Sequence, residues 1–310
     1  MAWVSCASIA LPVATGGGDR TLAEQRANAG LVYAADPKHG EIHIYDLAGS
    51  HQKEIGHVDG LPANFGLAVD GVGNVYVAVS GRSEVLVYAP RASTPFLRLR
   101  DPIGTNAPWG IAVSKTGDVA VANEVQLNPY RESHVSFFHR GATESYATIA
   151  NPNSVAECIY VAYDDVGNLY VLGHGAAGKT VLGEIAGGGH GSTIADLHLR
   201  GLGKTLAALQ VDTSGDVVVA QASQASVFAP QSNTLLRKIN YGGAEKSHAF
   251  TLTSSGKRFY ISNGRFNPTQ LWEYEYMSAE KPVNTIRVVP NRPEPVVQVW
   301  ALAIAPPAKP

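Results

Sequence analysis

Four polar side chains of this sequence could support metal or acid/base chemistry. Asp36, Asn123 and Glu157 offer carboxylate and amide oxygens, which a divalent cation such as calcium takes as ligands. His248 and Glu157 could instead form an acid/base pair, because histidine titrates near neutral pH. The same groups could equally line a water-filled channel and satisfy backbone groups there. The residue types alone leave these three interpretations open.

Two cysteines, Cys6 and Cys158, are the only thiols of the chain. They form no C-x-x-C pair and no cluster with histidine at zinc-ligand spacing, so a structural zinc site is not expected. Cys158 reads as a small buried apolar residue, and the alternative is a disulfide bridge between Cys6 and Cys158, within one chain or between neighbours. No G-x-S-x-G nucleophile motif is present.

Five windows of fourteen residues align without gaps and predict the elements that position these groups. Each window is an apolar strand, a polar turn with a common glycine, and a second apolar strand. The common glycines are 44, 50, 48 and 41 residues apart, a spacing that suits one four-stranded sheet per repeat. The windows are GLAVDGVGNVYVAV (66–79), GIAVSKTGDVAVAN (110–123), YVAYDDVGNLYVLG (160–173), ALQVDTSGDVVVAQ (208–221) and AFTLTSSGKRFYIS (249–262).

The two ends of the chain complete one another. Each window is followed by further alternating strands, such as EVLVYAP (84–90). Residues 30–36, 41–46 and 53–58 read as second, third and fourth strands without a first, and ALAIAP (301–306) reads as a first strand without the rest. Pairing of this C-terminal strand with the N-terminal three would close a ring and leave no open sheet edge at the seam.

The sequence therefore predicts an all-β fold, a six-bladed β-propeller of four-stranded antiparallel blades closed by its C-terminal strand. The propeller should span residues 30–306. An N-terminal extension, either leader-like or a docking segment, precedes it at residues 1–29, and a tail follows at 307–310.

Residues 65–90, FGLAVDGVGNVYVAVSGRSEVLVYAP, resemble an NHL repeat. The usual form of that repeat is a strand pair, in which G-I-A-V-D and G-N-x-Y-V-A are joined by a turn, followed by an R-V-x-V-[FY] strand. The resemblance covers roughly residues 30–306. Over this range the chain is distantly similar to the gluconolactonase/senescence-marker and streptogramin lyase propellers. It implies the fold only, because the repeat serves lyases, lactonases and interaction modules alike.

In the related enzymes, the metal or the base lies mostly on the residue eight positions before the turn glycine, at the mouth of the central channel. The resemblance implies carboxylate and amide ligands there for the lactonase group, and histidine for the lyase group. In this sequence the equivalent positions form what we call the channel-mouth rim: Phe65, Trp109, Ile159, Ala207, His248 and, by alignment of the last strand, Trp300. Calcium takes six to eight oxygen ligands, and the side chains of this rim offer none.

Composition and charge narrow the classes of partner. The chain has 24 lysine and arginine residues against 26 aspartate and glutamate residues, so a basic surface for nucleic acid is not expected. No run approaches the length of a membrane-spanning helix. The apolar stretch from Ala2 to Ala14 resembles a shortened secretory signal, although no lysine or arginine precedes it. We therefore expect an extracytoplasmic or secreted protein.

Our favoured expectation is a non-catalytic propeller, without a cofactor, that acts through surface contacts with proteins, including copies of itself. Residues 1–29 of one copy could add as a strand to an exposed outer blade edge of the next copy. Because donor and acceptor surfaces differ, such contacts give a ring or a filament. The long loops lie at the rim end of the channel, and we expect any partner or ligand there.

The alternative is a metal-assisted lactonase or lyase with a divalent cation at the channel mouth. His248, Glu157 and Asn123 would carry its chemistry. A third possibility is a small-molecule binding protein that uses the aromatic residues of the channel-mouth rim as a platform for a flat ligand.

Overall fold

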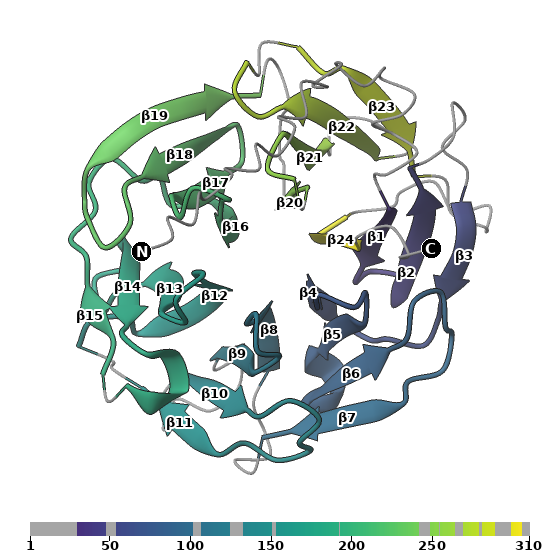
Figure 1. The fold of residues 1–310 in the computed structure, drawn as a ribbon, viewed down its shortest axis with the longest axis horizontal. Helices are drawn as coiled ribbons and strands as arrows, with labels where there is room; N and C mark the ends of the chain where they lie inside the picture. Colours follow the sequence, from purple (N-terminus) through teal and green to yellow (C-terminus); the bar gives the residue numbers. More distant parts are fainter. Residues whose placement is uncertain are drawn as a thin grey trace, which may run out of the picture.

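The computed structural model describes residues 30–47, 54–101, 107–124, 133–150, 153–191, 193–241, 249–253, 255–263, 269–278, 281–288 and 299–305. In this part of the chain, six four-stranded antiparallel sheets stand radially around a central channel, like the blades of a wheel (Figure 1). The predicted all-β six-bladed propeller is confirmed. The helices of these residues are two short 3-10 turns, Ser80–Arg82 and Gly188–His190, and none is long and apolar enough to cross a membrane.

Blades 1 to 3 contain the first half of the chain together with its last strand. In each blade the strands follow one another from the channel outward. Blade 1 consists of β24 (Ala301–Ala305), β1 (Leu31–Asp36), β2 (Glu41–Asp46) and β3 (Glu54–Val58). Blade 2 consists of β4 (Asn64–Val69), β5 (Val75–Val79), β6 (Glu84–Tyr88) and β7 (Leu97–Arg100). Blade 3 consists of β8 (Ala107–Val113), β9 (Val119–Glu124), β10 (His134–Phe138) and β11 (Ala147–Ile149).

The other three blades follow the same order in the second half of the chain. Blade 4 consists of β12 (Glu157–Tyr163), β13 (Leu169–His174), β14 (Thr180–Ile185) and β15 (Ala195–Asp196). Blade 5 consists of β16 (Leu206–Val211), β17 (Val217–Gln221), β18 (Gln224–Phe228) and β19 (Leu235–Asn240). Blade 6 consists of β20 (Phe250–Leu252), β21 (Arg258–Asn263), β22 (Gln270–Glu275) and β23 (Asn284–Arg287).

The ring closes in blade 1, where the last strand of the chain pairs with the first. Strand β24 runs antiparallel to β1 in a register from Leu31 opposite Ala305 to Ala35 opposite Ala301. Leu302 packs on the blade 6 side, and Ala305 packs on the blade 2 side. This alternation follows from the two-residue period of a strand. The predicted closure by the C-terminal strand is therefore confirmed.

The hydrophobic core is divided into six clusters of buried side chains, one at each interface between neighbouring blades. At the interface of blades 1 and 2, Tyr33 and Ile44 meet Val77 and Leu86. Each blade thus covers both of its apolar faces with its neighbours, which explains why both faces of the strands are apolar in the sequence.

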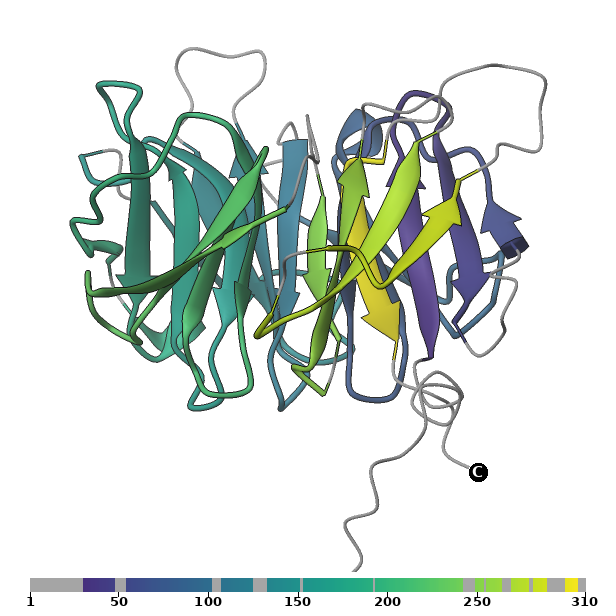
Figure 2. The same cartoon turned by 90° about the horizontal axis from the view of Figure 1, so that it is seen from above.

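The turns between the first and second strands lie at the lower face of the wheel in Figure 2, where β24 ends. Gly73 adopts a φ of 93°, which a residue with a Cβ rarely adopts, as the sequence alignment predicts. Asp70 stabilises this turn, because its Oδ1 accepts hydrogen bonds from the backbone N–H groups of Val72 and Asn74. We call this side the glycine-turn face.

Deleting residues 301–310 should destabilise the propeller severely. The deletion removes β24, exposes the edge of β1 and opens two core clusters, so we expect a loss of about 4 kcal/mol or more in the free energy of unfolding. A fall of roughly 10 °C or more in the midpoint of thermal unfolding, followed by circular dichroism, would correspond to this loss. Deletion of residues 307–310 alone is the control, and an unchanged midpoint for the longer deletion would contradict the closure.

Candidate functional site

The channel-mouth rim is built by a repeated irregularity of the innermost strands. The pairing register shifts between Asn64 and Gly66, and shifts again at the equivalent point of blades 3, 4 and 5. A bulge of this kind leaves one residue unpaired and turns its side chain in a new direction. The unpaired residues are Phe65, Trp109, Ile159 and Ala207, which are four members of the predicted rim.

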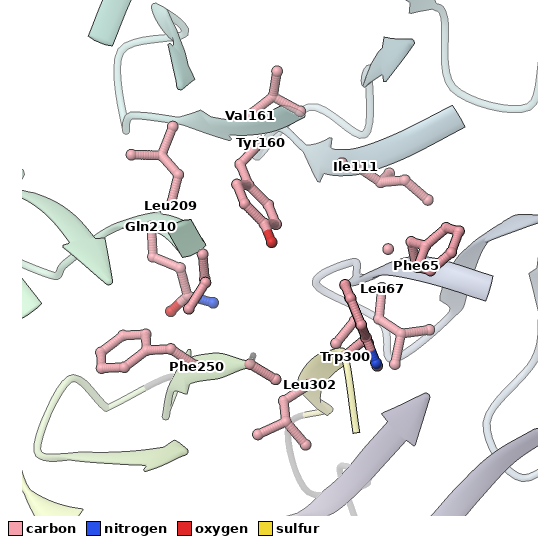
Figure 3. A pocket seen from close by; sticks show the side chains of 16 residues that line it. Phe65, Leu67, Ile111, Tyr160, Val161, Leu209, Gln210, Phe250, Trp300 and Leu302 are labelled. Carbon is pink, nitrogen blue, oxygen red and sulfur yellow. The ribbon is translucent and has the colours of Figure 1, made fainter. Parts of the chain in front are cut away.

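Three aromatic side chains of the channel-mouth rim pack against one another. The rings of Phe65 and Trp109 are stacked, with centroids 4.1 Å apart and an interplanar angle of 10°. Trp300 meets Phe65 edge-on, at a centroid distance of 5.6 Å. All three side chains are half-buried, and Phe65 and Trp300 lie beside each other at the channel in Figure 3. This part of the rim is therefore an apolar, self-supported cluster.

Close contact between inner strands supports the stack. A Cβ placed on Gly66 would collide with the backbone carbonyl of Trp109, and one placed on Gly110 would collide with the carbonyl of Ile159. Only glycine allows the bulges of neighbouring blades to approach this closely. The glycine that follows Phe65 and the glycine that follows Trp109 therefore hold the rim together.

Tyr160 replaces this glycine in blade 4, and its side chain enters the channel, where its hydroxyl points toward the middle of the cavity (Figure 3). Burial raises the pKa of Tyr160 to about 12, although a hydrogen bond with the Trp109 side chain lowers it. The phenol is therefore protonated at neutral pH. We did not predict this residue from the sequence, although the tyrosine stands in the alignment where two other windows begin with glycine.

The channel has a narrow section next to the rim and a wide section toward the glycine-turn face. The narrow section has a volume of about 70 Å³ and is lined by Phe65, Tyr160 and Trp300 among others. The wide section has a volume of about 510 Å³ and reaches the turn residues Lys115 and Asp165. Six lining residues are common to both sections, namely Leu67, Ile111, Val161, Leu209, Gln210 and Leu302, so the two are successive parts of one channel.

The three predicted oxygen ligands lie in three different blades, each with partners of its own. Asp36 in blade 1 is buried, and its Oδ2 lies 2.6 Å from Nδ1 of His39. Asn123 in blade 3 donates to Oγ of Ser136 at 3.0 Å and to Asp101. Among the described residues, none of Asp36, Asn123 and Glu157 forms a hydrogen bond or an ion pair with another of the three.

Glu157 is exposed at the start of β12 and pairs across the strand with His174, whose Nδ1 lies 2.9 Å from Oε2 of the glutamate. His248 lies outside the described residues, so its pairing with Glu157 stays a prediction. No group of three or more metal-ligating side chains occurs in the part of the chain that the structure describes.

The predicted bridge between Cys6 and Cys158 also stays a prediction, because Cys6 lies outside the described residues. Cys158 is fully buried in the core between blades 3 and 4, as its interpretation as a small buried apolar residue predicts. Burial raises the pKa of its thiol to about 11. The thiol is therefore protonated at neutral pH, which makes it a poor nucleophile.

A buried polar cluster that we did not predict joins blades 2 and 3. Oδ2 of Asp101 accepts hydrogen bonds from Oγ of Ser136 and from Nδ2 of Asn123, and lies 2.8 Å from Nε2 of His134. The serine hydroxyl is directed at the carboxylate rather than at the histidine, so this is not the arrangement of a nucleophilic triad. The cluster stabilises the connection from β7 to β8.

Solved structures share this fold, whereas no known protein family and no curated protein matches the sequence. A protein of unknown function from Bacteroides caccae is 13% identical, with a TM-score of 0.66 over 89% of this chain and 99% of that one. A chain of a nidogen/laminin complex is 19% identical, with a TM-score of 0.63 over 89% and 98%. Virginiamycin B lyase from Staphylococcus aureus is 13% identical, with a TM-score of 0.56 over 84% and 81%.

These similarities show the fold alone, because all three identities are low. The chain is thus similar in fold to virginiamycin B lyase and to a chain of a nidogen/laminin complex. The finer assignment to the NHL repeat stays a prediction.

Replacing Gly66 by alanine should disturb the channel-mouth rim. The new methyl group would collide with the carbonyl of Trp109, so we expect a loss of about 2 kcal/mol in stability and a displaced stack of Phe65 on Trp109. Chemical denaturation and tryptophan fluorescence measure the two effects. Gly71→Ala in the turn of the same blade is the control, since a Cβ there would meet nothing within 4 Å. Equal behaviour of the two variants would contradict the tight contact.

Proposed function

We propose that this protein is a non-catalytic, extracytoplasmic propeller that works through surface contacts and assembles with copies of itself through its N-terminal segment. The observation that carries the proposal is the channel-mouth rim. Phe65, Trp109 and Trp300 pack together at the place where an enzyme of this fold would need ligands or a base. An apolar cluster of this kind stabilises a contact but polarises no substrate.

The carboxylates of Asp36 and Asp101 support the same interpretation, because both are already engaged in local structure. Asp36 accepts hydrogen bonds from backbone N–H groups of the hairpin between β1 and β2 in addition to its contact with His39. Asp101 is saturated by Ser136, Asn123 and His134. Recruiting either group as a metal ligand would break buried hydrogen bonds, which is costly.

The outer circumference of the wheel offers the contact surface. The outermost strand of each blade has one edge without a partner strand in its sheet. Large apolar side chains are exposed on or directly before four of these strands, where the surface of a monomeric protein is usually polar or charged. They are Ile55 of blade 1, Phe96 of blade 2, Leu235 and Leu236 of blade 5, and Val283 of blade 6.

The N-terminal segment, residues 1–29, supplies the other half of the contact. It lies outside the described residues, and its sequence has an apolar stretch from Ala2 to Ala14. A strand of this composition can extend an outer sheet by backbone hydrogen bonds and cover apolar side chains at the edge. A chain of the same fold occurs in a nidogen/laminin complex, which agrees with a role in protein contacts.

Deleting residues 1–29 should convert the assembly into monomers, because the donor strand is lost while the propeller remains. Light scattering coupled to size-exclusion chromatography measures the mass. Phe96→Lys should weaken assembly in the full-length chain, whereas Val72→Lys, at an exposed turn position away from the outer edge, should not. An assembly state that is the same with and without residues 1–29 would refute the proposed self-assembly.

Removing divalent cations should leave the protein unchanged if it is not a metal-assisted lactonase or lyase. We expect the midpoint of thermal unfolding to move by less than about 1 °C between EDTA and millimolar calcium or magnesium, because a cation that binds the folded state raises its stability. A rise of several degrees with either cation, abolished in Glu157→Gln or Asn123→Ala, would favour the enzymatic alternative instead.

A further inference from the structure

The wide section of the channel is a cavity that the proposed surface contacts do not use. Its volume of about 510 Å³ is within the range of small-molecule sites, roughly 300 to 1,000 Å³. Leu67, Ile111 and Leu302 continue from this section into the narrow one, so an apolar wall runs along the axis. The section reaches the glycine-turn face, at the opposite end of the channel from the channel-mouth rim, where we expected a ligand.

The narrow section has hydrogen-bond donors at the end of this apolar wall. The hydroxyl of Tyr160 points toward the middle of the cavity in Figure 3, and a phenol can donate its O–H to an acceptor placed there. Gln210, on the inner strand of the adjacent blade 5, also faces the channel in Figure 3. Its Nε2 donates to Oγ1 of Thr251 at 3.2 Å, which uses one of the two amide hydrogens.

A second hydrogen bond, to the amide oxygen of Gln210, fixes the orientation of this side chain. Its Oε1 accepts a hydrogen bond from the backbone N–H of Leu252 at 2.7 Å, so the amide is oriented between β16 and β20. Oriented donors bind an acceptor without first losing conformational freedom. The arrangement therefore favours an oxygen acceptor in the narrow section.

Charge restricts the ligand further. None of the described residues that line the narrow section has a charged side chain. Three charged residues line the wide section in the described part of the chain. Lys115 and Asp165 form an ion pair of 2.8 Å with each other, and the carboxylate of Asp212 accepts hydrogen bonds from the backbone N–H groups of Ser214 and Asp216 and from the hydroxyl of Tyr276. A carboxylate or an ammonium group in the narrow section would lose its hydration without gaining a counter-ion, which strongly disfavours binding of a charged group there.

From this geometry we propose that the channel binds an uncharged small molecule that enters from the glycine-turn face. Its apolar body lies along Leu67, Ile111 and Leu302, and one carbonyl or hydroxyl oxygen accepts hydrogen bonds from Tyr160 and Gln210. The aromatic cluster of the channel-mouth rim narrows the other end, so the oxygen enters first and the apolar end stays toward the glycine turns. This binding is independent of assembly through the outer blade edges.

The probe for this site is the uncharged ketone propionyl-dimethylaminonaphthalene (Prodan), whose fluorescence shifts to the blue in apolar surroundings. The full-length protein should bind it with a blue shift. Tyr160→Phe should weaken binding about fivefold through the lost hydrogen bond. The control Tyr146→Phe removes a hydroxyl outside the channel lining and should bind Prodan like the unmodified protein.

A second variant tests the location without touching the hydrogen bonds of Tyr160. Leu252 lines only the wide section and is half-buried, so Leu252→Trp should fill part of the cavity and weaken Prodan binding at least tenfold. Circular dichroism and the unfolding midpoint check that each variant is folded. Prodan binding that is unchanged in both Tyr160→Phe and Leu252→Trp would overturn the proposal.

Competition tests the charge of the ligand with two molecules of similar shape. Acetylnaphthalene carries a neutral ketone, and naphthoate carries a carboxylate. Acetylnaphthalene should displace Prodan at a concentration at least tenfold lower than naphthoate. Equal displacement by the two, or stronger displacement by naphthoate, would show that the site does not select an uncharged oxygen.

Discussion

The antiparallel pairing of β24 with β1 is the interaction on which the rest of the molecule depends. Through it, Leu302 reaches the cluster between blades 6 and 1, and Ala305 reaches the cluster between blades 1 and 2. The other blades are continuous in the chain, so the seam is where the core is completed by residues from opposite ends. Because every blade covers the apolar faces of its neighbours, a gap at one interface exposes surface on both sides.

Close approach of the inner strands is a second constraint, and it shapes the channel. Gly66 and Gly110 let the bulges of blades 2, 3 and 4 come together, which stacks Phe65 on Trp109 and narrows one end of the channel. At the same strand position in blade 4, Tyr160 projects into the channel. The substitution of one small residue by a large polar one thus gives the narrow section its donor group.

Much of the fold could be predicted from the sequence, because it rests on local signals. Gly73 and Asp70 specify a turn through their own backbone and side-chain hydrogen bonds, and the alternating apolar strands on both sides repeat with it. The closure by residues 301–305 followed from counting strands. The rim residues were found by their distance from the turn glycine, but the bulges that direct them depend on neighbouring blades and leave no local pattern.

The polar groups show the limit of such reasoning more clearly. Asp36, Asn123 and Glu157 occupy similar strand ends, yet each belongs to a different blade and takes a nearby partner. Asp101 and His134 were not predicted, since their contact joins the end of one blade to the third strand of the next. The channel donors Tyr160 and Gln210 could be recognised only from the structure, because the cavity that they face cannot be derived from the alignment.

The composition of blade 1 has a consequence for biosynthesis. Its inner strand comes from residues 301–305 and its other strands from residues 31–58, so the contact between them spans almost the whole described chain. During translation, blades 2 to 5 can associate in order as they leave the ribosome, but β1 waits with an unpaired edge and an uncovered face until β24 emerges. Pairing of β24 with β1 is slow, because closing so long a loop costs chain entropy. Until it occurs, the nascent chain has an unpaired strand edge that can pair with other chains. The last step of folding is therefore the one most exposed to mispairing, and chaperone protection would matter most there.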